Sequence, residues 1–177
     1  TDALRLFGEA VSLGMPEQSV ARDRGLAYDL RGEPKRAQRD YALALRAGPD
    51  DELTIRYALS LGISGDDQDA MQMLDPLLRQ KNRSAWRARA FVLAMNGDVA
   101  AAQDVANSVM PGGAGESMAP FLQRLAALNP ADRALAVNYG IMPSDGSAFA
   151  VASAGDSYHP SGSGGASDGL IPAGDPL

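Results

Sequence analysis

A glycine followed five residues later by an alanine recurs along this chain at a nearly constant spacing. The three pairs are Gly32 with Ala37, Gly65 with Ala70, and Gly97 with Ala102. The pattern thus repeats after 33 and then 32 residues. A period of this length is the signature of a helical repeat, in which each unit consists of two packed helices. The glycine lets the chain turn out of the first helix, and the small alanine allows the second helix to pack closely. The chain is therefore predicted to fold as a stack of helix pairs.

The first copy also carries small, aromatic and proline residues at the positions that a helix–turn–helix unit needs. These residues are Gly25, Ala27, Tyr28, Gly32, Ala37, Tyr41, Ala44 and Pro49, with Ala21 where the family pattern begins with tryptophan. The pattern resembles the tetratricopeptide repeat (TPR), whose period is about 34 residues. The resemblance implies an all-α fold, a right-handed superhelical solenoid of antiparallel helix pairs.

The repeat pattern divides the chain into segments. Three TPR repeats are expected over residues 18–50, 51–83 and 84–115, and residues 1–17 match the second helix of a further, truncated repeat. Residues 116–142 are predicted to form a capping helix pair that covers the apolar face at the end of the solenoid. The alternative is a non-repetitive helical bundle in which the glycine and alanine pairs coincide by chance.

The segment from Pro143 to Leu177 differs in composition from the rest of the chain. Of its 35 residues, 18 are glycine, proline or serine, and none is lysine or arginine. Such a segment buries too little apolar area to offset its chain entropy, so we interpret it as a linker or tail. Its two apolar clusters, at residues 149–152 and 170–172, are alternatively segments that dock onto a groove.

The composition excludes several kinds of active site. The chain has no cysteine and a single histidine, His159 in the tail, so it offers no disulfide, no cysteine-bound metal and no well-fixed histidine base. We therefore expect a protein that is not an enzyme and binds no metal or other cofactor. An enzymatic alternative depends on Asp66, Asp67 and Asp69, which we interpret instead as residues that stabilise a helix N-terminus.

The distribution of charge argues against nucleic-acid binding. Residues 1–97 contain 14 basic and 14 acidic residues, whereas residues 98–177 contain 2 and 8, so the net charge of −6 arises from the second part (2 − 8 = −6). Neither part has the clustered cationic face that binds phosphates. No apolar run approaches the roughly 20 residues that span a bilayer, so we expect membrane attachment only through an N-terminal anchor outside this sequence.

Stacked helix pairs create a concave groove that is lined by the first helix of each pair. In the register set by the repeats, the groove positions are Arg22, Leu26, Asp29, Ile55, Leu59, Arg87, Phe91 and Met95. We expect a protein or peptide partner to lie in this groove, with apolar contacts from the leucine, phenylalanine and methionine side chains and orientation from Arg22 and Arg87. For Leu59 and Phe91, the alternative is packing between neighbouring repeats.

Residues 40–143 resemble a more specific family of TPR proteins. The stretches YALSLG (57–62), WRARAFVLAMNGD (86–98) and MAPFLQRL (118–125) are similar to the TPR lipoproteins of bacterial Flp (Tad) pilus assembly, the TadD family. The resemblance implies a non-catalytic scaffold of the bacterial cell envelope, periplasmic and anchored to the outer membrane, with secretin or pilus-assembly components as partners. The lipidated cysteine of that family does not occur here, as expected for a segment that starts downstream of it.

Two other interpretations stay open. Some alphaproteobacterial envelope proteins resemble this chain in having TPRs, then a linker, then a peptidoglycan-binding SPOR domain, which would lie outside this sequence. A cytoplasmic TPR co-chaperone is the other interpretation, although the groove has no cluster of lysine and asparagine to clamp a terminal carboxylate. The sequence leaves the oligomeric state open.

Overall fold

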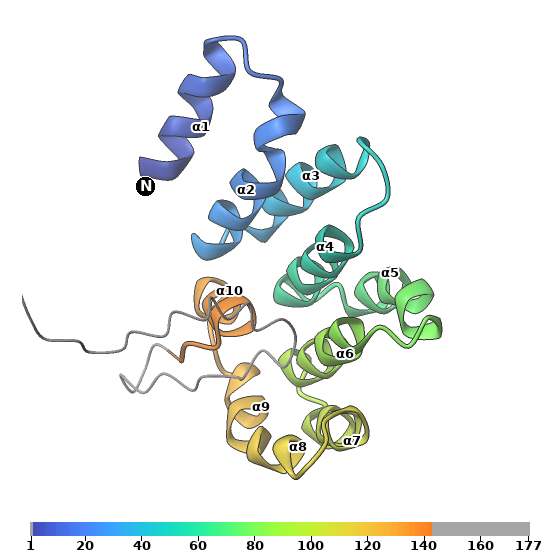
Figure 1. Cartoon of the computed structure of the whole chain (residues 1–177). Coiled ribbons are helices and arrows are strands. Elements are labelled where there is room, and N and C mark those ends of the chain that lie inside the picture. The colour runs from blue at the N-terminus through green and yellow to red at the C-terminus, as the bar shows by residue number, and fades with distance from the viewer. Residues whose placement is uncertain (1, 143–177) are drawn as a thin grey trace, which may run out of the picture.

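The part of the chain described by the computed structural model, residues 2–142, is all helical and contains no strand (Figure 1). Its helices are α1 (Asp2–Ser12), α2 (Glu17–Leu30), α3 (Pro34–Leu45), α4 (Asp51–Ser64), α5 (Asp67–Arg79), α6 (Arg83–Met95), α7 (Val99–Val109), α8 (Ala114–Ser117), α9 (Ala119–Leu125) and α10 (Pro130–Tyr139). The all-α prediction is thus confirmed for these residues. The predicted tail, residues 143–177, and its two apolar clusters lie outside the described residues.

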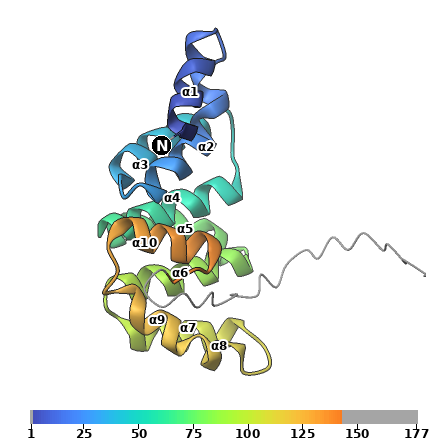
Figure 2. The ribbon, with the colours of Figure 1, turned by 90° about the vertical axis from the view of Figure 1, so that its left-hand side faces the viewer.

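Consecutive helices pack against each other along the chain. α2 packs on α3, α4 on α5, and α6 on α7, and successive pairs meet where α4 contacts α3 and α6. Figure 2 shows α1 at one end of the described structure and α7 with α8 near the other. Helices α4 and α6 are therefore direct neighbours, although α5 separates them in the sequence.

Glycines with left-handed backbone conformation form the turns between the paired helices. The φ angle is +74° at Gly32, +83° at Gly65 and +92° at Gly97. Glycine adopts such angles without the steric penalty that a Cβ atom brings. The prediction that the chain turns at these three glycines is confirmed.

Side-chain caps fix where several of the helices begin. The acceptor oxygens belong to Asp50 at α4, Asn82 at α6, Asp98 at α7 and Asn129 at α10, and each accepts a hydrogen bond from the backbone N–H three residues later, at 2.9–3.1 Å. Each cap satisfies an N–H group that has no partner within its helix. The expected cap at Asn129 is among them.

Two glycines inside helices allow neighbouring helices to approach closely. A Cβ atom added at Gly25 in α2 would lie 2.6 Å from Cε1 of Tyr41 in α3, and one added at Gly62 in α4 would lie 2.9 Å from Cγ2 of Val92 in α6. Real Cβ atoms essentially never approach other atoms this closely. The buried side chains of Tyr41 and Val92 occupy the space that the glycines leave.

The buried apolar residues form two clusters that meet at α4. The larger cluster spans α4 to α7, α9 and α10 and includes Leu74, Phe121 and Leu125. The smaller cluster lies between α2, α3 and α4 and surrounds Tyr41. Tyr57 of α4 packs against both clusters, with its ring centroid 6.2 Å from that of Tyr41. The core is therefore continuous along the described helices from α2 onward.

The last helices do not lie together as the predicted capping pair. α9 packs on α6 and α7, as a capping helix would, but α10 returns along the molecule and packs against α2, α4 and α6 (Figure 2). The prediction for residues 116–142 is therefore corrected for α10. Its small residues, Ala131, Ala134 and Ala136, let it lie close to several helices.

Replacing Gly25 with alanine is expected to lower the free energy of unfolding by about 1–3 kcal/mol, which is typical of overpacking. Gly8 is the matched control, because it also lies inside a helix but a Cβ atom added there would have no neighbouring atom within 4 Å. Gly8→Ala is expected to stabilise by up to about 1 kcal/mol through helix propensity alone. Urea denaturation measures both variants, and equal effects would contradict the close approach of α2 and α3.

Candidate functional site

Helices α2, α4 and α6, the first helices of the three predicted repeats, form one side of the described structure. We call this side the first-helix face. α10 lies against all three helices, so a later part of the same chain covers part of the face (Figure 1). All eight predicted groove residues belong to α2, α4 or α6. The candidate site is therefore the first-helix face together with α10.

Small side chains let α10 approach the first-helix face. Ala134 and Ala136 are fully buried. A Cβ atom added at Gly32, just after α2, would lie 3.3 Å from the backbone nitrogen of Ala131. The start of α10 therefore contacts the turn at the end of α2 almost directly.

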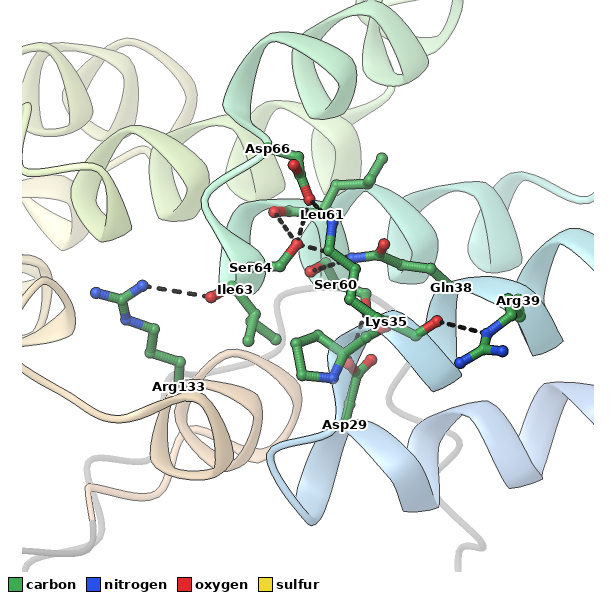
Figure 3. Close-up of polar contacts among 11 residues, drawn as sticks. Asp29, Lys35, Gln38, Arg39, Ser60, Leu61, Ile63, Ser64, Asp66 and Arg133 are labelled. Atoms are coloured by element: carbon green, nitrogen blue, oxygen red, sulfur yellow. Dashed lines mark hydrogen bonds and ion pairs between the residues drawn. The ribbon is translucent and has the colours of Figure 1, made fainter.

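Arg133 of α10 donates three hydrogen bonds to carbonyl groups of neighbouring segments. Its guanidinium donates to the carbonyl oxygens of Leu125 at 3.2 Å, Ala126 at 2.7 Å and Ile63 at 3.4 Å. Figure 3 shows the last of these, which reaches the final turn of α4. Carbonyl groups in a final turn have no partner within their own helix. Arg133 therefore satisfies acceptors of α4 and α9 while it positions α10.

Four of the predicted groove residues are buried. The exposed fractions are 1% for Asp29, 6% for Leu59, 3% for Phe91 and 4% for Met95. Phe91 packs against Phe121 of α9, with their ring centroids 5.5 Å apart. The expectation that these four side chains are open to a partner is therefore corrected: α9, α10 and the neighbouring helices enclose them. For Leu59 and Phe91 this is the packing alternative.

The other four predicted residues, Arg22, Leu26, Ile55 and Arg87, are half-buried. Arg22 forms ion pairs with Asp50 and, at 3.9 Å, with Glu52, both at the start of α4. Its charge is thus balanced by carboxylates of this chain. Ile55 and Arg87 line open space beside α10. The structure therefore brings two of the eight predicted residues together at an accessible position.

Two adjoining hollows remain between the first-helix face and the C-terminal half of α10. The larger has a volume of about 380 Å³ and lies between α4, α6 and α10, and the smaller has a volume of about 270 Å³ and lies between α6 and α10. Arg87, Val137 and Asn138 contribute to both walls. The remaining apolar wall consists of Ile55 and Leu59 in the larger hollow and of Phe91 and Ala136 in the smaller.

Arg87 has neither a hydrogen bond nor an ion pair within residues 2–142. Burial of the guanidinium lowers the pKa of Arg87 from its ordinary value. An arginine side chain nevertheless keeps its proton in proteins. The two hollows are therefore bordered by a positive charge that has no counter-charge of its own.

Asp29, the one acidic residue among the predicted groove positions, belongs to a buried hydrogen-bonded group. Its carboxyl accepts hydrogen bonds from the hydroxyl groups of Tyr41 at 3.0 Å and Ser60 at 2.7 Å, which joins α2 to α3 and α4. Burial raises the pKa of Asp29 to about 7, and the two hydrogen bonds oppose this rise. The pKa of Tyr41 is raised as well, by burial and by the nearby carboxyl. This group is structural and faces the core.

The aspartates of the enzymatic alternative are engaged in local contacts. Asp66 accepts hydrogen bonds from Lys35 and from Ser64, and these lower the pKa of its carboxyl (Figure 3). Burial raises the pKa of Asp67, one oxygen of which has no hydrogen bond. Asp66 occupies the N-cap position of α5 without a side-chain capping bond, so that part of the capping interpretation is corrected. Asp67 and Asp69 lie in the first turn, where they complement the helix dipole.

Comparison with protein-family models, with curated proteins and with solved structures finds no match to this chain. Within residues 2–142, no helix combines the length and the apolar character needed to cross a bilayer. Across the same residues, histidine, cysteine and acidic side chains do not gather in a group of three or more that could hold a metal ion. His159 lies outside the described residues.

Phe91→Ala is expected to lower the free energy of unfolding by about 3–5 kcal/mol, because it removes a buried ring from the contact with Phe121. Leu13→Ala is the control, since Leu13 is 88% exposed and its truncation is expected to change stability by less than about 0.5 kcal/mol. Thermal and urea denaturation measure both changes. A loss below about 1 kcal/mol for Phe91→Ala would mean that this ring lies on an open surface.

The buried carboxyl of Asp29 predicts that stability falls as pH rises from about 4 to about 7. Its pKa is 3.8 in an unperturbed chain and about 7 in the folded protein. In this range the folded state binds the proton more firmly than the unfolded state, so a rise in pH favours unfolding. The loss is at most about 4 kcal/mol, since one pKa unit corresponds to about 1.4 kcal/mol.

The measurement is urea denaturation at about pH 5 and about pH 8. Asp29→Asn keeps an acceptor oxygen but cannot ionise. The variant should therefore lose less stability than the parent chain between about pH 5 and about pH 8. Asp23→Asn on the same helix is the control, because Asp23 is exposed. If both variants keep the pH dependence of the parent chain, Asp29 is ionised in the folded state at both pH values.

Proposed function

We propose that this protein is a non-catalytic TPR scaffold of the bacterial cell envelope that binds a protein or peptide segment on its first-helix face. In this proposal the helix pairs form the right-handed superhelical solenoid of that family. The protein assists Flp (Tad) pilus or secretin assembly, as the resemblance to the TadD family suggests. It is periplasmic and anchored to the outer membrane through a segment outside this sequence.

The helix boundaries support the TPR part of the proposal. α2 and α3 fall almost wholly within the expected repeat 18–50, α4 and α5 within 51–83, and α6 and α7 within 84–115. The turn glycines recur at the expected places and have left-handed φ angles. Gly25 and Ala37 are buried where α2 and α3 meet, as the small positions of such a repeat require.

The observation that carries the binding proposal is the hollow of about 380 Å³ between α4, α6 and α10. Ile55, Leu59 and Val137 give it apolar walls, and Arg87 adds a positive charge without a partner. Asp51, Glu52, Arg56 and three uncharged polar residues form the rest of the wall. A recess in which an apolar patch adjoins a fixed charged group is typical of a site that binds a side chain of a partner. α10 covers part of the face, so the partner contacts α10 as well as α4 and α6.

A second candidate function shares the binding mode but differs in its setting. The composition of residues 143–177 favours a linker, which supports a TPR adaptor that precedes a SPOR-type peptidoglycan-binding domain outside this sequence. The partner on the first-helix face is again a protein segment. The two proposals differ in whether that partner belongs to the pilus or secretin apparatus.

Ile55→Ala is expected to weaken binding of the partner by about 1–3 kcal/mol, since it removes apolar contact from the wall of the hollow. The measurement is a calorimetric titration of the chain with purified secretin and with pilus-assembly components. Leu43→Ala is the matched control, because Leu43 is also a half-buried apolar residue but lies on α3, outside the first-helix face.

Thermal melts of both variants separate lost binding from lost folding. Binding that weakens equally in the two variants would contradict the proposed face. Absence of binding to every pilus and secretin component would contradict the proposed role in their assembly.

A further inference from the structure

Arg87 differs from the other arginines without a carboxylate partner in being half-buried beside a hollow. Arg46 and Arg83 also lack an ion pair within residues 2–142, but their side chains are exposed. Arg89 and Arg133 are half-buried without an ion pair, but Arg89 lies over the Trp86 ring and Arg133 donates to three carbonyl groups, and neither lines the hollow. Water solvates an exposed guanidinium well, whereas burial removes part of this solvation from Arg87. A negatively charged group in the hollow would restore the lost solvation energy. On this face, an anion bound beside Arg87 would therefore gain the most favourable electrostatic energy.

The walls around Arg87 restrict what kind of anion fits. Ile55, Leu59 and Val137 line the larger hollow with Arg87, and Phe91 lines the smaller one. These side chains favour apolar groups in the part of the ligand that contacts them. The planar fork of a guanidinium matches the two oxygens of a carboxylate. A carboxylate on an otherwise apolar segment satisfies both requirements.

The other charged groups at the hollow limit the charge of the ligand. Asp51, Glu52 and Arg56 also line its wall. Glu52 is paired with Arg56 at 2.6 Å and lies 3.9 Å from Arg22, so its charge is balanced. Asp51 is exposed and repels anions. A group with a single negative charge is therefore favoured over a phosphate, which carries nearly two.

We propose that the hollow beside Arg87 receives an acidic side chain of the partner segment, and that apolar side chains next to it contact Ile55 and Val137. The inference rests on the proposed function and specifies the chemistry of the partner. Arg22, the other arginine predicted to orient a partner, has no such role, because Asp50 and Glu52 already balance it. Recognition of charge on this face thus depends on one residue.

The test uses the full 177-residue chain and a phage-displayed library of random peptides. Peptides selected on the parent chain, without prior depletion on any variant, are expected to contain aspartate or glutamate next to leucine, isoleucine, valine or phenylalanine. The strongest peptide is then synthesised and titrated calorimetrically. Its dissociation constant is expected to rise at least tenfold for Arg87→Gln, and equally when its own acidic residue is replaced by the amide.

Two variants serve as controls for charge and folding. Arg83→Gln, which removes an exposed arginine from the same helix, is expected to change the affinity less than twofold. Arg87→Lys keeps the charge but loses the planar fork, so its affinity should lie between those of the parent chain and Arg87→Gln. Thermal melts show whether each variant is folded, and Arg87→Lys replaces Arg87→Gln if the latter does not fold.

Three outcomes would overturn the inference. They are selected peptides without enrichment in acidic residues, no selected peptide at all, and a peptide that binds Arg87→Gln as tightly as the parent chain. The proposed function fails in a different way, since it predicts that Ile55→Ala weakens binding whether or not the partner is acidic. A peptide that requires Ile55 but not Arg87 would keep the binding face and reject the acidic partner.

Discussion

The arrangement of this protein depends on how closely its helices approach one another at positions without a bulky side chain. Because Gly25 has no side chain, the ring of Tyr41 can pack directly against it. Gly62 leaves space in the same way for Val92 and the end of Met95. Each contact fixes the distance between two helices, and hence the place of everything attached to them. The hollows beside α10 exist because α4 and α6 are held at this spacing, which places Ile55 and Arg87 on one wall.

Polar groups divide the first-helix face into two electrostatically different parts. Near α2, the carboxylates of Asp50 and Glu52 balance Arg22, and Asp29 is enclosed with Tyr41 and Ser60. Near α6, Arg87 forms no ion pair within residues 2–142, although Asp51 and Glu52 line the same hollow. The half-buried positive charge without an ion pair therefore lies at the α6 end of the face, next to Ile55 and Val137. A ligand that binds at this end contacts both the positive charge of Arg87 and the apolar side chains beside it.

Local sequence determined the elements that could be predicted, and distant pairings determined those that could not. Turns at Gly32, Gly65 and Gly97 follow from the need for left-handed backbone angles, and the start of α10 follows from the cap at Asn129. The pairing of Ser60 with Asp29 joins residues 31 positions apart, which no repeat period specifies. The place of α10 was missed for a similar reason. Its buried alanines carry little information about which helix they pack against, and the carbonyl groups that Arg133 binds, one of them in α4, are distant from it in the sequence or irregularly spaced.

The return of α10 changes how the chain is expected to unfold. A row of helix pairs that touch only their neighbours behaves as a one-dimensional array, in which end units fray independently of the rest. α10 contacts α2 as well as α6, so it links early and late parts of the row. Loss of order in α2 removes support from α10, and loss of α10 exposes α4 and α6. The described helices should therefore melt more nearly as a single cooperative unit, at the cost of the slower folding that contacts between distant residues entail.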